Sequence, residues 1–295
     1  MRHDDRLRSL ALPMKDDCSL GFASQGGLSH YTRIGCFHEP PRTIKMRLQY
    51  GSPHPIEQTL MCGRYRLTRK KEILAEHFGI EPPDNWQPRY NVAPGQEVPV
   101  IRQDAEQPRR YGSNMKWGLI PFWSKDPNIG FKMINARSEG ITERAAFKEA
   151  LKKRRCLIPA DGFYEWQKSG NKKRPFCFTM SDESPFAFAG LWERWKNPEG
   201  QWIETCSIIT TTPNKLTEDV HDRMPVILHP DDYDLWLDPG FQKTEDLVAL
   251  LKPYDPEAMS RYEVSDRVNA VKNDDPECVA PVQPEPPEAQ ATLFG

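Results

Sequence analysis

The chain has 295 residues, 38% of them hydrophobic, which is enough for one sizeable globular domain and argues against two once weakly structured ends are set aside. Its 40 basic and 42 acidic residues give a net charge of −2, which excludes the global positive field of a histone-like protein, so any DNA binding must come from a local patch. The seven cysteines form no C-x-x-C pair, which excludes a zinc ribbon or disulfide framework and indicates a reducing, cytoplasmic compartment. No apolar run approaches the roughly 18 residues that cross a bilayer, so we expect no membrane role.

Both ends of the chain differ in composition from its middle. Residues 1–60 show no helical or strand period and scatter Gly, Pro, His and Ser, which predicts an unstructured leader. Pro, Glu and Gln dominate Pro281–Pro287, and we expect a disordered tail over residues 280–295. The folded domain is therefore expected to be residues 61–279.

Strands are predicted to dominate the middle of this domain, because short runs of β-branched and aromatic residues recur there. In chain order the runs are Val98–Arg102, Met115–Ile120, Cys156–Trp166, Pro175–Met180, Phe186–Trp195, Thr205–Thr211 and Val226–Leu228. Apolar residues spaced by three and four predict amphipathic helices at Lys70–Phe78, Ile141–Lys153, Asp231–Leu237 and Thr244–Leu251. Since strands and helices do not alternate regularly, we expect a single α+β domain, with a mainly antiparallel curled or barrel-like sheet flanked by helices.

The domain begins with Met61–Tyr65, and a methionine followed by a small residue is typical of an initiation site that methionine aminopeptidase cleaves. Cys62 would then carry an α-amine with a pKa of about 8 and a thiol with a pKa of about 8.5 on adjacent carbons. The amine can form a Schiff base with an aldehyde, and the thiol can close on the imine carbon to give a thiazolidine. The alternative is a buried, inert cysteine in a first strand, which the Met-Cys-Gly tripeptide taken alone favours.

Six motifs follow one another along the domain. They are Met61–Tyr65, Arg89–Gly95, Trp117–Pro121, Ile134–Glu139, Pro159–Trp166 and His221–Pro225, and Val268–Asn273 closes the series. In this order they resemble the SRAP (SOS response-associated peptidase) family of abasic-site processing proteins, from Met61 to about Lys272. The resemblance implies a protein of the DNA damage response that binds abasic sites in single-stranded DNA and forms a covalent thiazolidine with them. We expect it to act without cofactor or metal, as a nucleoid-associated monomer.

By this resemblance Cys62 crosslinks to the DNA, and Asn135, Glu165 and His221 complete the active site. The Asn135 amide can orient the attack without taking a proton, although a turn or helix-cap role is the alternative. His221 can act as a general acid on the sugar oxygen or support reversal of the crosslink, and its alternative is a surface or capping histidine. Zinc binding is not expected, because His221 and His229 lack cysteine partners at ligand spacing.

Glu165 lies in a predicted strand whose alternation places Phe163 and Glu165 on one face and Tyr164 and Trp166 on the other. A carboxyl group that shares an inward face with Phe should have a raised pKa and could shuttle protons during Schiff-base formation. A solvated strand glutamate is the alternative.

DNA binding is expected near these positions. Arg64, Arg137 and Arg223 each lie within two residues of a proposed catalytic position and could hold phosphates on either side of a lesion. Trp117 and Trp123 could stack on flanking bases or wedge the strand, although Trp117 fits a core aromatic equally well. Asn91, in the second motif, is assigned to the DNA-binding residues with them.

Three other functions remain open. A class II glutamine amidotransferase also uses a cysteine that follows Met, but no acceptor-substrate domain fits in the remaining residues. A peptidase could use Cys62, His221 and Glu165 as nucleophile, base and orienting group, and could remove its own leader. A noncatalytic binder of DNA ends or gaps predicts no covalent product.

The leader departs from the family pattern, in which the cysteine directly follows the initiator methionine. As printed, Cys62 has no free amine. Three explanations are open: translation starts at Met61, the leader is removed by proteolysis, or the chain with its leader is inactive. We favour initiation at Met61.

Overall fold

A computed structural model of the chain describes residues 62–81, 86–104, 106, 108–170 and 172–282. All of them belong to one compact unit. The predicted leader over residues 1–60 lies outside the described residues, as does the predicted tail from residue 283 onward.

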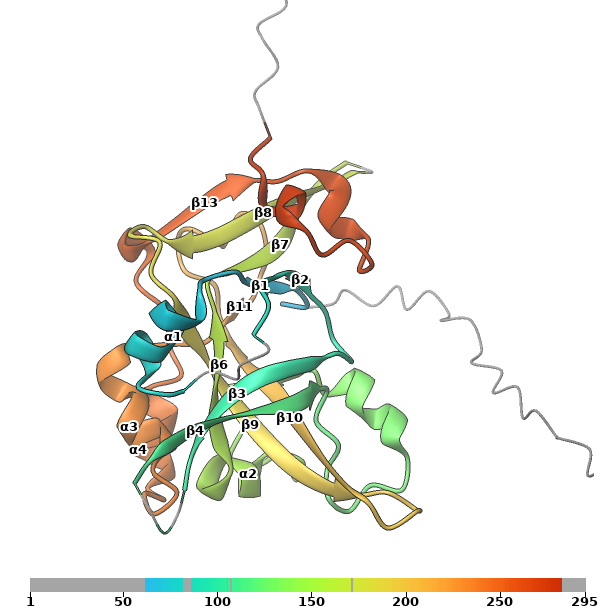
Figure 1. Cartoon of the computed structure of the whole chain (residues 1–295), viewed down its shortest axis with the longest axis vertical. Coiled ribbons are helices and arrows are strands. Elements are labelled where there is room, and N and C mark those ends of the chain that lie inside the picture. The colour runs from blue at the N-terminus through green and yellow to red at the C-terminus, as the bar shows by residue number, and fades with distance from the viewer. Residues whose placement is uncertain (1–61, 82–85, 105, 107, 171, 283–295) are drawn as a thin grey trace, which may run out of the picture. The chain divides into compact units, whose positions relative to one another are not determined.

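Five strands close into a barrel, as predicted from the runs of β-branched and aromatic residues. They are β3 (Glu97–Gln103), β4 (Arg110–Trp117), β6 (Arg155–Ala160), β9 (Phe186–Lys196) and β10 (Trp202–Thr211). Strand β10 pairs with β4 on one side and β9 on the other, and β3 and β6 complete the ring between β4 and β9 (Figure 1). The β4–β10 pairing is parallel and the other pairings of the ring are antiparallel. This confirms the expected mainly antiparallel, barrel-like core.

Three short strands extend the barrel near the ends of β9 and β10. Strand β5 (Asn135–Arg137) pairs in parallel with β10, while β11 (Met224–Pro225) and β12 (Ile227–Leu228) pair antiparallel with β10 and β9. They bring two segments that are far apart in the sequence onto β10. The site described below depends on this convergence.

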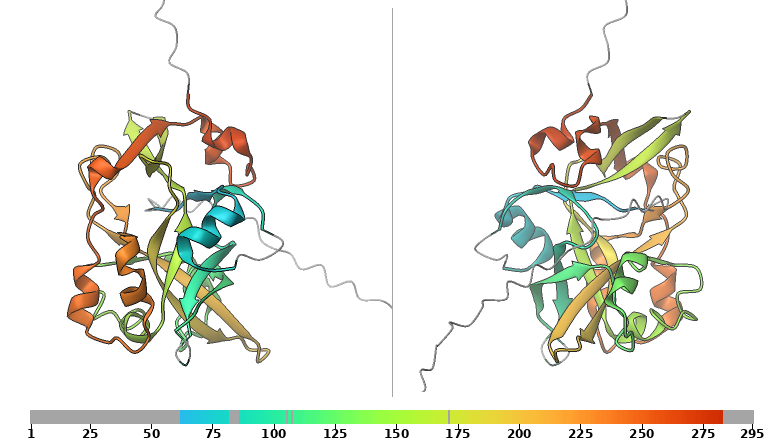
Figure 2. Two further views of the ribbon diagram at one scale, coloured as in Figure 1. Left: turned by 60° about the vertical axis from the view of Figure 1, so that its left-hand side comes forward. Right: turned by 90° about the vertical axis from the view of Figure 1, so that its right-hand side faces the viewer.

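A second, antiparallel sheet lies across one end of the barrel, where both views of Figure 2 place it. Its order is β13 (Met259–Glu263), β8 (Lys172–Met180), β7 (Gly162–Ser169), β1 (Tyr65–Leu67) and β2 (Arg89–Val92). The first strand of the domain, β1, is therefore an interior strand, between β7 and β2.

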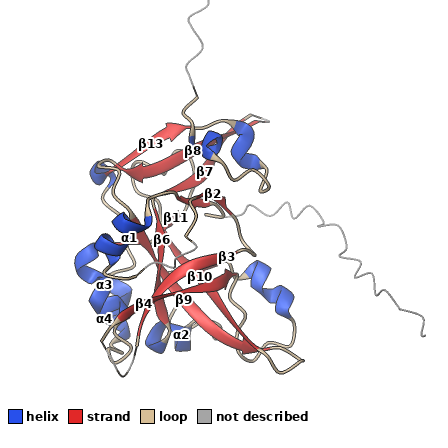
Figure 3. Ribbon diagram, viewed as in Figure 1, coloured by secondary structure: helices blue, strands red, loops and turns tan. Residues whose placement is uncertain are grey.

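Short helices flank the strands (Figure 3). They are α1 (Lys71–Phe78), α2 (Lys148–Lys153), α3 (Tyr233–Leu237) and α4 (Thr244–Ala249), and they confirm three of the predicted helices closely. The helix predicted over Ile141–Lys153 begins only at Lys148. Ile141 and Phe147 are both buried, and a continuous helix would turn side chains six residues apart to different faces. No helix in the described part of the chain is long and apolar enough to cross a membrane.

The single strand predicted over Cys156–Trp166 is two strands that belong to different sheets. The chain turns at Asp161, between β6 and β7, and the buried Asp161 carboxylate accepts hydrogen bonds from the backbone N–H and the hydroxyl of Thr68, both at 2.7 Å. The same carboxylate lies 3.3 Å from Arg66 Nε. Gly162 follows because a Cβ there would lie 2.5 Å from Arg66 Nε. The alternation of apolar and polar residues cannot reveal such a corner, because the corner does not interrupt the apolar run in the sequence.

The strand predicted over Met115–Ile120 also ends early, at Trp117. Gly118 has a φ of +132°, and a Cβ on it would lie 2.8 Å from the Gly130 carbonyl oxygen. The close backbone approach at Gly118 therefore ends β4.

Strand β7 separates two hydrophobic clusters. Phe163 belongs to the main core and stacks on Phe178 with ring centroids 5.0 Å apart, whereas Tyr164 belongs to a smaller cluster with Cys177 and Val264. The alternation predicted for this strand is confirmed. Glu165 thus has its side chain on the same face as Phe163.

We predict that Asp161→Ala lowers the free energy of unfolding by about 3–5 kcal/mol, because it leaves the charge of Arg66 beside an empty, buried corner. Urea unfolding followed by tryptophan fluorescence measures this loss. Glu149→Ala serves as the control, since it removes an exposed ion pair with Lys152 and should change stability by less than about 1 kcal/mol. Equal losses in the two variants would contradict the role assigned to the corner.

Candidate functional site

Cys62 lies three residues before the start of β1, which is an interior strand of the second sheet. Its backbone N–H donates to Glu165 Oε1 at 2.9 Å, and its Sγ lies 3.8 Å from the carbonyl oxygen of Arg223. The residue is 4% exposed and has a φ of +42°, a conformation that L residues rarely adopt. Strained backbone of this kind is often found at functional sites.

Glu165 is buried on β7, which excludes the solvated alternative. Burial raises the pKa of its carboxyl to about 8, against the lowering effect of its hydrogen bonds with Cys62. Burial also raises the pKa of the Cys62 thiol, and the adjacent Glu165 raises it further. The pair is therefore a mostly protonated acid beside a mostly protonated thiol at neutral pH.

His221 lies in the turn that precedes β11, with its side chain largely buried. Its Nδ1 accepts the backbone N–H of Arg223 at 3.1 Å and lies 3.2 Å from Asp222 Oδ1. The carbonyl oxygen of Arg223 is 3.3 Å from the same nitrogen and also contacts the Cys62 thiol. The main chain of Arg223 thus lies between the thiol and the imidazole.

Asn135 is the first residue of β5 and pairs with Ile208 of β10, so it is neither a turn residue nor a helix cap. Arg137 lies two residues later, opposite Thr210, on the same face of the strand. Asn135 is half-buried and Arg137 is exposed. Strand β5 therefore places an amide and a guanidinium along one line beside β10.

The Arg223 side chain joins β5 to the turn that carries His221. Its guanidinium donates to both carboxylate oxygens of Glu139, at 2.6 and 2.8 Å, and to the carbonyl oxygen of Thr210 at 2.7 Å. The backbone N–H of Ser138 donates to that same carbonyl. Sequence patterns did not indicate a role for Glu139, although it closes the Ile134–Glu139 motif.

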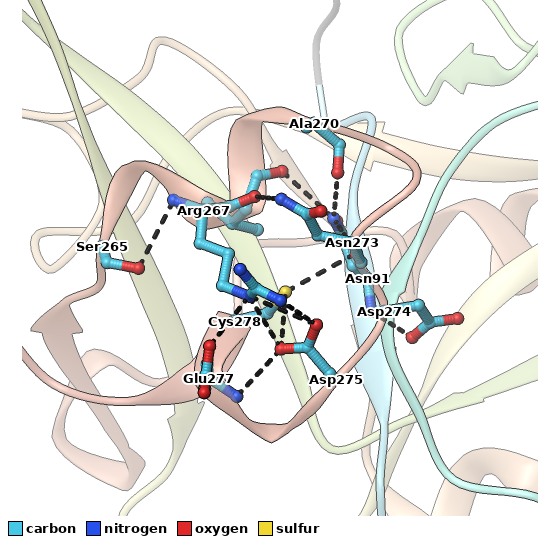
Figure 4. Close-up of polar contacts among 10 residues, drawn as sticks. Asn91, Ser265, Arg267, Ala270, Asn273, Asp274, Asp275, Glu277 and Cys278 are labelled. Atoms are coloured by element: carbon cyan, nitrogen blue, oxygen red, sulfur yellow. Dashed lines mark hydrogen bonds and ion pairs between the residues drawn. The ribbon is translucent and has the colours of Figure 1, made fainter.

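Arg64 and Asn91 hold the C-terminal segment against β1 and β2. Arg64 Nη1 donates to Asn91 Oδ1 at 2.8 Å and to the Val268 carbonyl at 2.7 Å. The Asn91 amide is fully buried and donates to the carbonyls of Val268, Ala270 and Asn273 (Figure 4). The predicted direct contact between Asn91 and DNA is wrong for this structure, because none of its polar atoms is exposed.

Trp117 and Trp123 have different environments. Trp117 is 1% exposed, packs on Tyr65 and donates to the Ile134 carbonyl at 2.8 Å. It is therefore a core aromatic residue, and the predicted stacking of Trp117 on DNA bases does not fit this structure. Trp123 is 51% exposed, and Phe122 and Phe131 are exposed to a similar extent. Phe122 and Phe131 were not predicted, although the adjacent aromatics Phe122 and Trp123 in a loop were a usable signal.

Among the described residues, no group of three or more His, Cys, Asp and Glu side chains is placed to hold a metal ion. The five cysteines of the described ranges are free thiols.

Comparisons with known proteins agree with this geometry. The family model described as SOS response associated peptidase (SRAP) matches residues 61–271. The abasic site processing protein YoqW of Bacillus subtilis is 45% identical over 223 residues, covering 74% of this chain and 99% of YoqW. The abasic site processing protein HMCES of Xenopus tropicalis is 34% identical over 228 residues, covering 68% of each chain.

Solved structures show the same fold. A protein from Bacteroides thetaiotaomicron superposes with a TM-score of 0.68 at 30% identity, covering 75% of this chain and 100% of that one. A protein from Bordetella bronchiseptica gives a TM-score of 0.61 at 28% identity, covering 69% of this chain and 100% of that one.

We predict that stability depends on pH through Glu165. Its folded pKa of about 8 lies above the unfolded value of 4.5, so the folded state keeps a proton that the unfolded state loses as the pH rises between these values. The stabilisation that protonated Glu165 provides is therefore complete below pH 4.5 and is lost as the pH rises through about 8. Relative to Glu165→Gln, the wild type should lose up to about 1.4 kcal/mol per pH unit.

Urea unfolding of the full-length chain, in which Cys62 keeps its backbone amide, and of its Glu165→Gln variant at several pH values between about 5 and 8 measures this difference. Glu139→Gln is the matched control, because the Arg223 hydrogen bonds lower the pKa of Glu139 and its titration is complete below this range. A difference between wild type and Glu165→Gln that stays constant over the range would contradict the raised pKa.

Proposed function

This chain belongs to the SOS response associated peptidase (SRAP) family, and we propose that it processes abasic sites in single-stranded DNA by forming a covalent thiazolidine at Cys62. The observation that carries the proposal is the hydrogen bond of 2.9 Å between the Cys62 backbone nitrogen and the buried Glu165 carboxyl. A buried carboxyl aimed at a backbone nitrogen is a proton acceptor for that nitrogen once it becomes an amine.

The proposed active chain begins at Cys62, after translation from Met61 and removal of the methionine. The family match, which begins at residue 61, supports this start. With an ammonium group in place of the amide, Glu165 is favoured in its charged form and can take the proton that makes the amine nucleophilic.

The proposed reaction has two bond-forming steps. The α-amine attacks the aldehyde carbon of the ring-opened sugar, and the carbinolamine loses one water to give an imine. The thiol of Cys62 then adds across the C=N bond, with sulfur bonding to carbon and the thiol proton passing to nitrogen, directly or through Glu165. His221 supplies the acid that opens the sugar ring, and Asn135 orients the sugar oxygen.

The raised pKa of the Cys62 thiol favours this reaction over a hydrolase mechanism. Cysteine peptidases and amidotransferases need a thiolate, which a nearby histidinium or other cation stabilises. Here burial and Glu165 both disfavour the thiolate. In the proposed reaction the amine attacks first and the thiol reacts within the same residue, so a free thiolate is not required.

The proposed DNA surface combines Arg137 with the exposed aromatic residues. Arg137 lies on the strand of Asn135 and is assigned to a phosphate next to the lesion. Trp123 is assigned to stacking on flanking bases, together with the adjacent Phe122 and with Phe131 in the 3-10 helix Pro127–Lys132 that follows. Arg64 and Arg223 support DNA binding through the segments that they hold.

We predict that the chain starting at Cys62 forms one adduct with a single-stranded oligonucleotide that carries one abasic site. Its intact mass should equal the sum of both components minus one water, as the two steps require. Cys62→Ser should give no thiazolidine, because a hydroxyl cannot replace the thiol in ring closure, whereas Cys278→Ser should react like the wild type.

Two results of this experiment would overturn the mechanism. An adduct on a chain that retains residues 1–61 would exclude an N-terminal amine. Retention of the thiazolidine by Cys62→Ser would exclude the residue assignment.

We predict that Trp123→Ala weakens binding to single-stranded DNA by about 1–3 kcal/mol, the usual contribution of one stacked base. Fluorescence anisotropy with an oligonucleotide that carries a non-reactive abasic analogue measures binding without the crosslink. Trp202→Ala is the matched control, because Trp202 is 53% exposed but lies at the start of β10. Equal losses in both variants would assign the effect to nonspecific contact rather than to the loop of Trp123.

Arg137→Gln tests the phosphate contact in the same assay. Loss of one contact should reduce the slope of log K against log salt by about 0.7, since each phosphate neutralised on a single strand contributes that amount. An unchanged slope would remove Arg137 from the DNA surface.

A further inference from the structure

The backbone of Arg223 contacts both reactive side chains of the site. Its carbonyl oxygen lies 3.8 Å from Cys62 Sγ, and its N–H donates to His221 Nδ1 at 3.1 Å. These two groups flank the same Cα, so a small shift of the Arg223 main chain would change the positions of the thiol and the imidazole together. Whatever fixes Arg223 therefore fixes the geometry of the site.

Two sets of contacts hold the Arg223 backbone: the pairing of β11 with β10 directly after it, and the side chain of Arg223 itself. Two parallel hydrogen bonds join the guanidinium to Glu139, at 2.6 and 2.8 Å, and such bidentate pairs hold both partners in one orientation. A third donation, to the Thr210 carbonyl, is buried. The Arg223 side chain is 9% exposed, so the fork is largely shielded from water on the arginine side.

Glu139 also connects the fork to the strand of Asn135. It lies two residues beyond the end of β5, and the intervening Ser138 donates its N–H to the same Thr210 carbonyl that accepts from Arg223. Cys62, His221 and Asn135 come from three segments of the chain. The Glu139–Arg223–Thr210 contacts are where two of those segments meet β10.

We propose that Glu139 is a positioning residue, which holds Arg223 so that its main chain keeps the Cys62 thiol in place and keeps the neutral His221 ring protonated on Nε2. The second part rests on the Arg223 N–H, which makes the shortest of three contacts at Nδ1, at 3.1 Å, and a nitrogen that accepts this N–H carries no proton. The Arg223 carbonyl at 3.3 Å and the Asp222 carboxylate at 3.2 Å are the acceptors that the opposite tautomer would use. Nε2 is then the donor that can protonate the sugar oxygen. This role rests on the proposed function for its consequence in catalysis, but not for the tautomer.

The test uses the chain that begins at Cys62 and two readouts. Long-range ¹H–¹⁵N spectra of ¹⁵N-histidine-labelled protein report which His221 nitrogen is protonated, without any DNA. The rate of adduct formation at saturating oligonucleotide reports the chemistry, and affinity for the non-reactive abasic analogue reports binding. The variants are Glu139→Gln and Arg223→Lys, which keeps the positive charge but loses the fork.

The wild type should show one His221 tautomer, with Nδ1 unprotonated. Both variants should show a mixture of tautomers and a rate reduced about ten- to hundred-fold, the cost of misplacing a reacting group by about 1 Å. In Glu139→Gln the affinity for the analogue should fall less than the rate, because Arg137 and Trp123, which are assigned to the DNA contacts, are not part of the Glu139–Arg223 pair. Glu204→Gln, which breaks a bidentate pair with Arg102 on the barrel, is the control and should leave all three readouts unchanged.

A single unchanged tautomer together with a wild-type rate in Glu139→Gln would overturn the proposal. If Glu139→Gln is unfolded, the same two readouts on Arg223→Lys decide, and an unchanged tautomer with a wild-type rate in that variant would also overturn the proposal. If the wild type forms no adduct, the proposed function fails, and the tautomer spectra still decide whether Glu139 positions His221.

Discussion

The burial of the Glu165 carboxyl against the backbone nitrogen of Cys62 is the contact on which the rest of the site depends. A carboxyl group is costly to bury unless it stays protonated or accepts hydrogen bonds. Glu165 has a raised pKa, which favours the protonated form, and it also accepts the backbone N–H of Cys62. The contact requires that β1, the first strand of the domain, pair directly with β7 in the second sheet. It also requires the corner at Asp161, which turns the chain out of the barrel and directs Glu165 to the same face as the core aromatics.

Arginine side chains make many of the contacts that surround this hydrogen bond, and each of them contacts acceptors within the protein. Arg66 meets Asp161, Arg64 meets Asn91 and the carbonyls of the C-terminal segment, and Arg223 meets Glu139. Guanidinium groups suit this role because five fixed donors can satisfy several acceptors at once where water is excluded. The consequence for DNA binding is that a position near Cys62 in the sequence does not by itself make an arginine available to DNA. Arg64 and Arg223 donate to acceptors within the protein, and the Arg223 side chain is largely buried. Arg137 is exposed on the strand of Asn135.

Much of this site could be predicted from sequence, and the limits have physical causes. The period of two in β7 correctly separated Phe163 from Tyr164 and showed that Glu165 faces inward, because alternation is a local property. The break at Asp161, the short strands β1, β2 and β5, and the role of Glu139 depend on partners far away in the chain, and local patterns do not carry that information. Asn91 shows the same limit: a polar residue in a family motif suggested DNA contact, and only its three carbonyl partners show that it is a buried support.

The backbone of Cys62 connects the fold to the question of where the active chain begins. A φ of +42° is unfavourable for a non-glycine residue chiefly because the side chain approaches the carbonyl group of the preceding residue, at a cost on the order of 1–2 kcal/mol. If Cys62 is the first residue, that carbonyl does not exist and the same placement of nitrogen, Cα and thiol carries no such cost. The hydrogen bond to Glu165, the contact with Arg223 and the position of the thiol could then all be kept while the strain is removed. The geometry around Cys62 thus supports the proposal that the active chain begins at this residue, as amine-first chemistry would require.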